Sequence, residues 1–322
     1  MSPLVNVYRG DYLESLHHID FVLLGTKGVL ASSGNLDERL FPRSTLKLHQ
    51  AYDFVASGAY HNSQSQPQHL SLACASHNAS LEQIQSLEKW LADNSLTEED
   101  LVCGPNLPLL EPDVMAWAKT GHPLRRLHNN CSGKHTAMLL NARHLGFPLT
   151  DYHLPEHPIQ KRFLDIMQKI FRIDLSNNGH ALDGCGLVNY RMSLQELANA
   201  FLQLACRQDA TVDVLLKAIC DNPRYFAGEG RLVSDLLLAT GGRILAKDGA
   251  EGMMAAVVRD RQIALAIKVK DGAFRASQTA LMGLFMEFEL LKQEELLLLK
   301  KWQQPTIQNS LKQTAGHLNY SK

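Results

Sequence analysis

Strand-like segments at both ends of the sequence, with helical patterns between them, limit what this chain can fold into. Near the N-terminus, residues 4–8 and 21–24 are rich in residue types that favour strands, and Gly25-Thr26-Lys27-Gly28 indicates a hairpin after the second segment. Toward the C-terminus, residues 252–258 and 262–270 form another pair of strand-like segments. We therefore expect the two ends of the chain to build one sheet.

Apolar residues recur at helical spacing through most of the intervening sequence. We expect helices at residues 44–55, 80–91, 134–145, 159–171, 193–205 and 212–220, and a long helix from Arg275 to about Trp302. The expected fold class is α/β in the α+β sense, with an antiparallel sheet from the N- and C-terminal segments and a largely helical middle section.

The same pattern predicts a single domain over residues 1–302. Its sheet subdomain would comprise about residues 1–60 and 243–302, and its helical subdomain about residues 77–240. Residues 303–322 are polar and show no apolar period, so we expect a loosely held C-terminal tail.

Composition excludes several classes of function. The 32 basic and 33 acidic residues nearly cancel and form no basic block, which argues against binding of nucleic acid or anionic lipid. Met1-Ser2-Pro3 is not followed by a basic segment and a long apolar stretch, so we expect a cytoplasmic protein with no membrane partner. The six cysteines show no Cys-x-x-Cys pair, as expected of thiols in a reducing compartment.

Ser44 and Lys47 are the first candidate catalytic residues. They stand three positions apart at the start of an expected helix, a spacing that lets a lysine amine act as base for a serine nucleophile. Ser86 and Lys89 repeat the spacing, but on the polar side of their expected helix. The alternative for the first pair is a helix-capping serine followed by a surface lysine.

A lysine acts as a base only when it is neutral, so burial or nearby cations must lower its pKa. Arg43 and a second lysine near Ser44 could supply that charge. Lys268 is a candidate, because residues 263–270 alternate between large aliphatic residues and a face of two alanines and two lysines. The alternative is an edge strand that lysines protect from aggregation.

Cys131, Lys134 and Cys185 form a second constellation. Cys131 and Lys134 lie where a loop is expected to become a helix, a position that favours a thiolate, and Cys185 lies between Gly184 and Gly186. Two thiolates and a neutral amine could hold a soft or borderline metal such as zinc. Two unrelated buried thiols, or a nucleophilic Cys131, are the alternatives.

Taken together, these segments resemble the asparaginase II family over nearly the whole chain. The pieces that recur in the same order are Arg43-Ser44-Thr45-Leu46-Lys47, Cys74-Ala75-Ser76-His77, Asn129-Asn130-Cys131-Ser132-Gly133-Lys134-His135, His157-Pro158-Ile159-Gln160, Asp183-Gly184-Cys185-Gly186, and Lys268 with Asp271-Gly272-Ala273. The resemblance implies a fold similar to serine β-lactamases and glutaminases, and hydrolysis of the side-chain amide of L-asparagine to L-aspartate and ammonia.

The resemblance also implies roles for individual residues. Ser44 matches the nucleophile and Lys47 its base, while Ser76 and Lys268 match a second serine–lysine pair. Arg43, His135 and Asp183 match residues that line the substrate pocket, and Cys131, Lys134 and Cys185 match a site for one zinc ion per protomer that supports substrate binding. Members of the family are commonly homodimers.

The chain departs from the family pattern beside some of these residues. Asn78 stands where a glycine is usual, and Val233-Ser234 stands where an Asp-Thr pair is common. These changes make amide hydrolysis a firmer expectation than asparagine as the substrate. The alternatives are a glutaminase, another hydrolase of the same fold acting on a peptide or lactam, and a non-enzymatic protein that binds zinc or a ligand.

Overall fold

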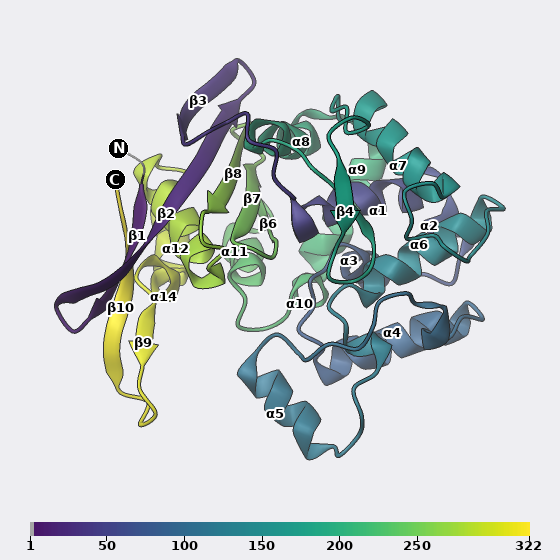
Figure 1. The fold of residues 1–322 in the computed structure, drawn as a ribbon, viewed down its shortest axis with the longest axis horizontal. Helices are drawn as coiled ribbons and strands as arrows, with labels where there is room; N and C mark the ends of the chain where they lie inside the picture. The colour runs from purple at the N-terminus through teal and green to yellow at the C-terminus, as the bar shows by residue number, and fades with distance from the viewer. Residues whose placement is uncertain (1–2) are drawn as a thin grey trace. The chain divides into compact units, whose positions relative to one another are not determined.

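The computed structural model describes residues 3–322, so Met1 and Ser2 lie outside the described residues. The chain divides into two units, which we describe separately (Figure 1). The sheet unit comprises Met1–Thr45, Met192–Cys206 and Asp235–Lys322, and the helical unit comprises Leu46–Arg191 and Arg207–Ser234.

The sheet unit is built around an antiparallel sheet in the strand order β6-β7-β8-β2-β1-β10-β9, with β3 paired to β2. The strands are β1 (Leu4–Arg9), β2 (Tyr12–Gly25), β3 (Gly28–Ser33), β6 (Ile244–Asp248), β7 (Met253–Val258), β8 (Ile263–Val269), β9 (Thr306–Gln308) and β10 (Thr314–Ser321). The long strand β2 joins the two ends of the chain, because its first half pairs with β1 and its second half with both β3 and β8. This arrangement confirms the predicted mixture of helices with an antiparallel sheet built from both ends.

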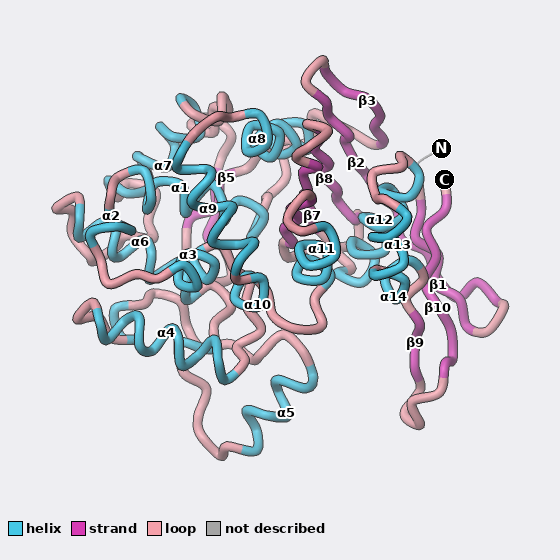
Figure 2. Tube along the Cα trace, turned by 180° about the vertical axis from the view of Figure 1, so that it is seen from behind, coloured by secondary structure: helices cyan, strands magenta, loops and turns pink. Residues whose placement is uncertain are grey.

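Helices cover the middle of the sheet on two sides. Helix α8 (Leu194–Cys206) packs against β2, β7 and β8, while α12 (Phe274–Glu287) packs against β1, β7, β8 and β10. Figures 1 and 2 show α8 and α12 on opposite sides of β7 and β8. Every residue of β7 is buried for this reason, and its sequence is continuously apolar rather than alternating.

The helical unit packs its helices around α6 (Ser132–His144). Helix α1 (Lys47–Ala56) contacts α6 and α9 (Ala210–Asp221), and α3 (Pro67–Ala73) contacts the same two helices. The other elements are α2 (Ala59–Asn62), α4 (Leu81–Asp93), α5 (Glu111–Lys119), α7 (Pro158–Lys169), β4 (His180–Leu182), β5 (Val188–Tyr190) and α10 (Pro223–Phe226). Helix α11 (Leu232–Thr240) begins in this unit and ends in the sheet unit. No helix within residues 3–322 is both long and apolar enough to span a membrane.

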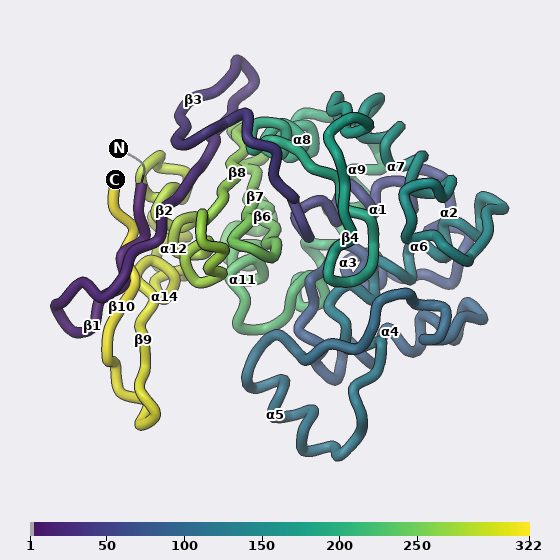
Figure 3. Tube along the Cα trace, viewed as in Figure 1, coloured from purple at the N-terminus to yellow at the C-terminus, as the bar shows by residue number. Residues whose placement is uncertain are grey.

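The prediction of a loosely held tail at residues 303–322 is wrong. Strand β10 lies between β1 and β9, and its backbone pairs with β1 from Leu4–Ser321 to Arg9–Gly316 (Figure 3). Leu318 is buried against the unit, whereas the alternate residues of the strand are more exposed. Polar composition misled the prediction because only one face of this strand needs apolar residues.

The long helix expected from Arg275 to Trp302 is also wrong, because it is three helices: α12, α13 (Gln293–Leu298) and α14 (Lys300–Gln303). Helix α12 ends where Glu289 adopts a left-handed backbone conformation with φ of 52°. The Leu290 N–H then bonds to the Phe285 carbonyl oxygen, which is the hydrogen bond of a helix-terminating motif.

The boundaries expected for the two subdomains need correction at three places, the smallest of which is that residues 235–240 belong to the sheet unit. Residues 46–60 belong to the helical unit, because α1 buries one side against α6 and α9. Met192–Cys206 belongs to the sheet unit, because α8 packs on the sheet. That residues 1–302 act as a single catalytic domain stays a prediction.

Candidate active site

A helix buried on every side, α6, carries three of the predicted site residues at or near its N-terminus. Its residues from Ser132 to Ala142 are all buried. Gly133 permits the close packing of α3 on α6, since a Cβ there would lie 2.4 Å from the backbone oxygen of Leu72. Because Ser76 follows α3 by three residues, this packing brings the loop that carries Ser76 toward the start of α6.

The amine of Lys47, at the first residue of α1, lies in a buried polar site of the helical unit. Its Nζ donates to the backbone oxygens of Ala75 and Asn130, at 2.5 and 3.2 Å, and to Ser76 Oγ at 3.2 Å. Lys47 and Ser76 are both almost fully buried. The structure therefore brings together two of the four predicted catalytic residues, in a pairing that the sequence did not indicate.

Ser44 lies on a different kind of backbone from the one expected. Residues Arg43–Leu46 form a 3-10 turn, η1, and the α-helix begins only at Lys47. Arg43, directly before Ser44, has a φ of 54°, in the left-handed region that side chains other than glycine rarely adopt. Thr45 holds the turn by donating from Oγ1 to the Pro42 carbonyl oxygen at 2.7 Å. Strained backbone of this kind is often found at functional positions.

A cluster of sulfur and nitrogen atoms joins Cys131, Lys134 and Cys185 within the helical unit. Lys134 Nζ donates to Cys185 Sγ at 3.2 Å, and the Cys131 thiol bonds to Cys185 and lies 3.2 Å from Asn130 Oδ1. All three side chains are buried. The predicted grouping of these residues is thus present, although its use as a metal site stays a prediction.

The hydrogen bond between the two thiols has opposite effects on their pKa values. Its hydrogen bond to Cys185, together with burial, raises the pKa of Cys131 to about 12. The bond received from Cys131, helped by the Lys134 charge and opposed by burial, lowers the pKa of Cys185 to about 5. Burial disfavours the charge on Lys134, but the two sulfurs and Asp183 raise its pKa overall. The buried cluster therefore holds an ammonium–thiolate pair at neutral pH.

This donor set fits a thiophilic metal ion when Lys134 gives up its proton. Two cysteine sulfurs and one amine converge, and zinc accepts sulfur and nitrogen ligands. Within residues 3–322, no group of three or more histidine, cysteine or carboxylate side chains is placed to hold a metal. If a metal binds at the cluster, Cys131, Cys185 and Lys134 would be its protein ligands, and binding would release the Lys134 proton.

His135 and Asp183 border this cluster. The Tyr152 hydroxyl receives the Val102 N–H at 3.0 Å and lies 2.7 Å from His135 Nδ1, so the tyrosine donates its own proton to that nitrogen. Burial lowers the pKa of His135 well below its usual value, which leaves a neutral ring with its proton on Nε2. That Nε2 has no hydrogen-bond partner among residues 3–322. Asp183 lies on the turn after β4 and accepts the Gly184 N–H at 2.8 Å.

The sheet unit carries two lysines of interest on its strands, Lys268 on β8 and Lys247 on the edge strand β6, and only Lys268 was predicted. Lys268 on β8 is partly exposed, and its Nζ donates to the Glu251 carbonyl oxygen at 2.5 Å. Burial lowers the pKa of Lys268, against the opposing effect of Glu251. Lys247 on β6 is fully buried and donates to the backbone oxygen and the carboxylate of Asp248, both at 2.8 Å. Its position in Lys247-Asp248-Gly249, after an apolar strand, was the signal that the sequence offered.

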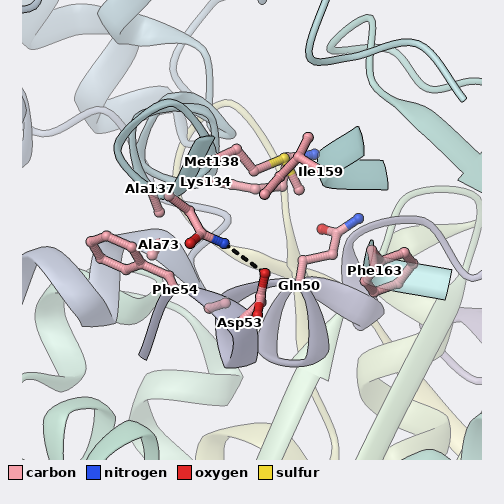
Figure 4. A pocket seen from close by; sticks show the side chains of 11 residues that line it. Gln50, Asp53, Phe54, Ala73, Lys134, Ala137, Met138, Ile159 and Phe163 are labelled. Carbon is pink, nitrogen blue, oxygen red and sulfur yellow. Dashed lines mark hydrogen bonds between the residues drawn. The ribbon is translucent and has the colours of Figure 1, made fainter. Parts of the chain in front are cut away.

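A small cavity lies behind Lys134 in the helical unit (Figure 4). Its volume of about 20 Å³ is enough for one water molecule. Asp53 lines it and accepts hydrogen bonds from Asn141 Nδ2 at 2.8 Å and Arg162 Nε at 2.7 Å. The cavity is too small for an amino acid, so it is a packing feature and not the substrate pocket.

The helical unit thus holds a serine hydroxyl beside a lysine amine in a buried site. The sequence profile of the L-asparaginase II family matches residues 5–320, nearly the whole chain. The chain therefore belongs to the L-asparaginase II family, and is an amide hydrolase of the asparaginase type.

Solved structures of low sequence identity show only a partial likeness. A β-lactamase from Mycobacterium bovis is 15% identical, with 85% of this chain and 95% of that chain covered and a TM-score of 0.47. A candidate β-lactamase from Bacteroides dorei is 14% identical, with coverages of 80% and 88% and a TM-score of 0.40. None of the curated sequences compared with this chain matches it significantly.

Proposed function

We propose that this chain hydrolyses the side-chain amide of L-asparagine to L-aspartate and ammonia. The observation that carries the proposal is the 3.2 Å contact between Lys47 Nζ and Ser76 Oγ in a buried site. Membership of the L-asparaginase II family supports the choice of substrate.

The reaction would proceed through an acyl-enzyme. Ser44 Oγ would form a bond to the amide carbon as its proton passes through Ser76 Oγ to Lys47 Nζ, and the carbon–nitrogen bond would then break as that proton passes to the leaving ammonia. Water attacks the resulting ester in the same way and releases aspartate. Backbone N–H groups near Ser44 or Ser76 would stabilise the oxyanion, each contributing about 3 kcal/mol.

The surroundings of Lys47 suit a base once its amine is neutral. A neutral amine keeps two N–H groups, which the backbone oxygens of Ala75 and Asn130 can accept. The third direction, toward Ser76 Oγ, would then carry the lone pair, which accepts a hydroxyl proton. Ser76 can therefore relay protons to Lys47.

The resemblance pairs Ser76 with Lys268, but within the helical unit Ser76 contacts Lys47. Our proposal therefore gives the role of base to Lys47, and a catalytic role for Lys268 stays a prediction.

We further propose that Asp183 pairs with the α-ammonium group of the substrate and that Arg43 and His135 bind its α-carboxylate. The unpartnered Nε2–H of His135 supports this role, because a buried donor is stabilised by a carboxylate acceptor.

A zinc ion on Cys131, Lys134 and Cys185 is part of the proposal. When bound, it would polarise and hold the substrate as a Lewis acid without supplying the attacking hydroxide. Metal analysis of the purified protein should find about one zinc per chain, and Cys185→Ser should lower that content. A homodimer, which the family resemblance implies, and a cytoplasmic location are proposed as well.

Ammonia release from L-asparagine tests the function, with L-glutamine and a β-lactam assayed in parallel. We expect turnover of asparagine well above that of the other two substrates. Ser44→Ala should abolish turnover in a folded protein, and mass spectrometry of a trapped acyl-enzyme should place the ester on Ser44. An ester on Ser76 would instead make Ser76 the nucleophile and leave the supporting role to Ser44. A zinc-loaded protein that releases ammonia from neither amide would instead support a binding protein.

A further inference from the structure

A buried arginine, Arg231, holds the backbone of the loop that carries Ser76. It lies just before α11 in the helical unit, and only 2% of its surface is exposed. Its Nη1 donates to the Ser76 carbonyl oxygen at 3.2 Å and to Asn78 Oδ1 at 2.8 Å. The guanidinium group therefore spans the residue whose hydroxyl meets Lys47 and the residue two positions later.

Asn78 completes this connection between two distant segments. Its backbone N–H donates to the Ala227 carbonyl oxygen at 2.9 Å, and its Nδ2 donates to the Glu229 carbonyl oxygen at 3.1 Å. Since Oδ1 accepts from Arg231, both ends of the Asn78 side chain are fixed to residues 227–231. Asp113 on α5 adds a carboxylate that bonds to Asn78 and offsets the Arg231 charge.

The residue between Ser76 and Asn78 is held independently. His77 Nε2 lies 2.9 Å from Ser132 Oγ on α6, and its Nδ1 accepts the Ala79 N–H at 3.1 Å. Burial lowers the pKa of His77 to about 3, so the ring is neutral in this site. With His77 fixed to α6, the contacts from Arg231 determine the position of the Ser76 carbonyl.

We propose that Arg231 is a positioning residue that sets Ser76 Oγ against Lys47 Nζ. A planar guanidinium group can reach two acceptors in a fixed geometry, whereas a lysine amine in its place would carry the charge without that geometry. The catalytic consequence rests on the proposed function, because it requires that the Ser76–Lys47 contact take part in amide hydrolysis.

A double-mutant cycle separates positioning from general stabilisation. Arg231→Lys should lower kcat by about 30-fold or more and change KM by less than about 3-fold, since a 1 Å misplacement near the chemistry costs about 100-fold. In a Ser76→Ala background the same change should cost less than about 2-fold, because the group that it positions is already gone. Losses that multiply in the double variant would overturn the proposal.

Arg243→Lys is the matched control. Arg243 is a mostly buried arginine of the sheet unit that donates to Glu295 and to the Leu290 carbonyl oxygen. The same substitution there should lower stability without a selective loss of kcat. If Arg231→Lys does not fold, Asn78→Ala takes its place in the cycle. Asn78→Ala should lower kcat by about 5-fold in the parent chain, and should have little further effect on kcat in the Ser76→Ala background.

A crystal structure of Arg231→Lys tests the geometry apart from any activity. We expect the Ser76 Oγ to Lys47 Nζ distance to exceed hydrogen-bonding range, compared with 3.2 Å in the parent chain. An unchanged distance would refute the positioning role. If the parent chain is inactive, the proposed function is refuted. If the Arg231→Lys structure nevertheless shows Ser76 displaced from Lys47, the positioning role of Arg231 still holds.

Discussion

The surroundings of Lys47 and of Lys268 differ in how firmly the protein holds each amine. In the helical unit, Lys47 is buried among two backbone oxygens and a serine hydroxyl that belong to packed segments. In the sheet unit, Lys268 is partly exposed, and its amine bonds to Glu251 on a turn with a left-handed backbone. Alternation along a strand indicates which face a lysine lies on, but not how deeply it is buried or what it contacts.

The largest expected difference between the surroundings of Lys47 and those of Lys268 is in the loss of kcat when each lysine is replaced. Lys47→Met should lower kcat by about 10³-fold, because loss of a general base typically costs 10²–10⁴-fold. Lys268→Met should lower it by less than about 10-fold. Steady-state ammonia release at saturating asparagine measures both, with circular dichroism to show that each variant is folded. Equal losses would restore Lys268 as a second catalytic lysine.

The next effect concerns stability within the sheet unit. Lys247→Met removes one partner of a fully buried ion pair with Asp248 and should lower the free energy of unfolding by about 3–5 kcal/mol. Lys268→Met removes a partly exposed amine and should cost less than about 1 kcal/mol. Urea denaturation of the two variants gives the comparison, and a larger loss for Lys268 would contradict it.

A pH dependence should distinguish the sulfur cluster of the helical unit. Since the pKa of Cys185 is about 5 when folded and about 8.5 when unfolded, the unfolded chain binds more protons between these values. The stabilising effect of this thiolate is therefore present above about pH 9 and is lost as the pH falls through 5. The metal-free parent chain and the metal-free Cys185→Ser variant should differ more in unfolding free energy at pH 8.5 than at pH 5.5.

Cys206→Ser is the control. Because burial raises the pKa of Cys206, the effect of this substitution on the unfolding free energy should not grow with pH. A Cys185→Ser difference that is the same at both pH values would show that no thiolate forms.

The smallest effect concerns the turn that carries Ser44. A Cβ at Gly249 would lie 3.0 Å from the Pro42 carbonyl oxygen and 3.2 Å from Thr45 Cγ2, so Gly249→Ala should shift this turn. We expect kcat to fall by about 10-fold with little loss of stability. Gly104→Ala is the matched control, since open space surrounds that position. If both variants kept full activity, the turn would tolerate displacement.

Local patterns in the sequence were sufficient for much of the fold. Helix α4 begins at Ser80 with the capping pair to Gln83 that its sequence indicates. The hairpin from β2 to β3 likewise follows from the glycines at positions 25 and 28. Strand β10 could not be recognised in the same way, because its pairing with β1 depends on backbone groups that every sequence provides.

The candidate site was predictable as a set of residues but not as a set of contacts. The grouping of Cys131, Lys134 and Cys185 followed from motifs, whereas the contacts that lower the pKa of Cys185 and raise that of Cys131 did not. The burial of Lys247 and the reach of Arg231 to Ser76 depend on packing between segments distant in sequence. No local pattern encodes such distances.

Strand β10 also sets an order of events for synthesis of the protein. Asn6 and Ser321, which hydrogen-bond across neighbouring strands, are 315 positions apart, so the edge of β1 that pairs with β10 stays unpaired until residues 314–321 have been made and have emerged. Meanwhile its unpaired edge is exposed to other nascent chains. Chaperone demand during translation should therefore fall mainly on the sheet unit, because the helical unit has all of its segments once residue 234 has emerged.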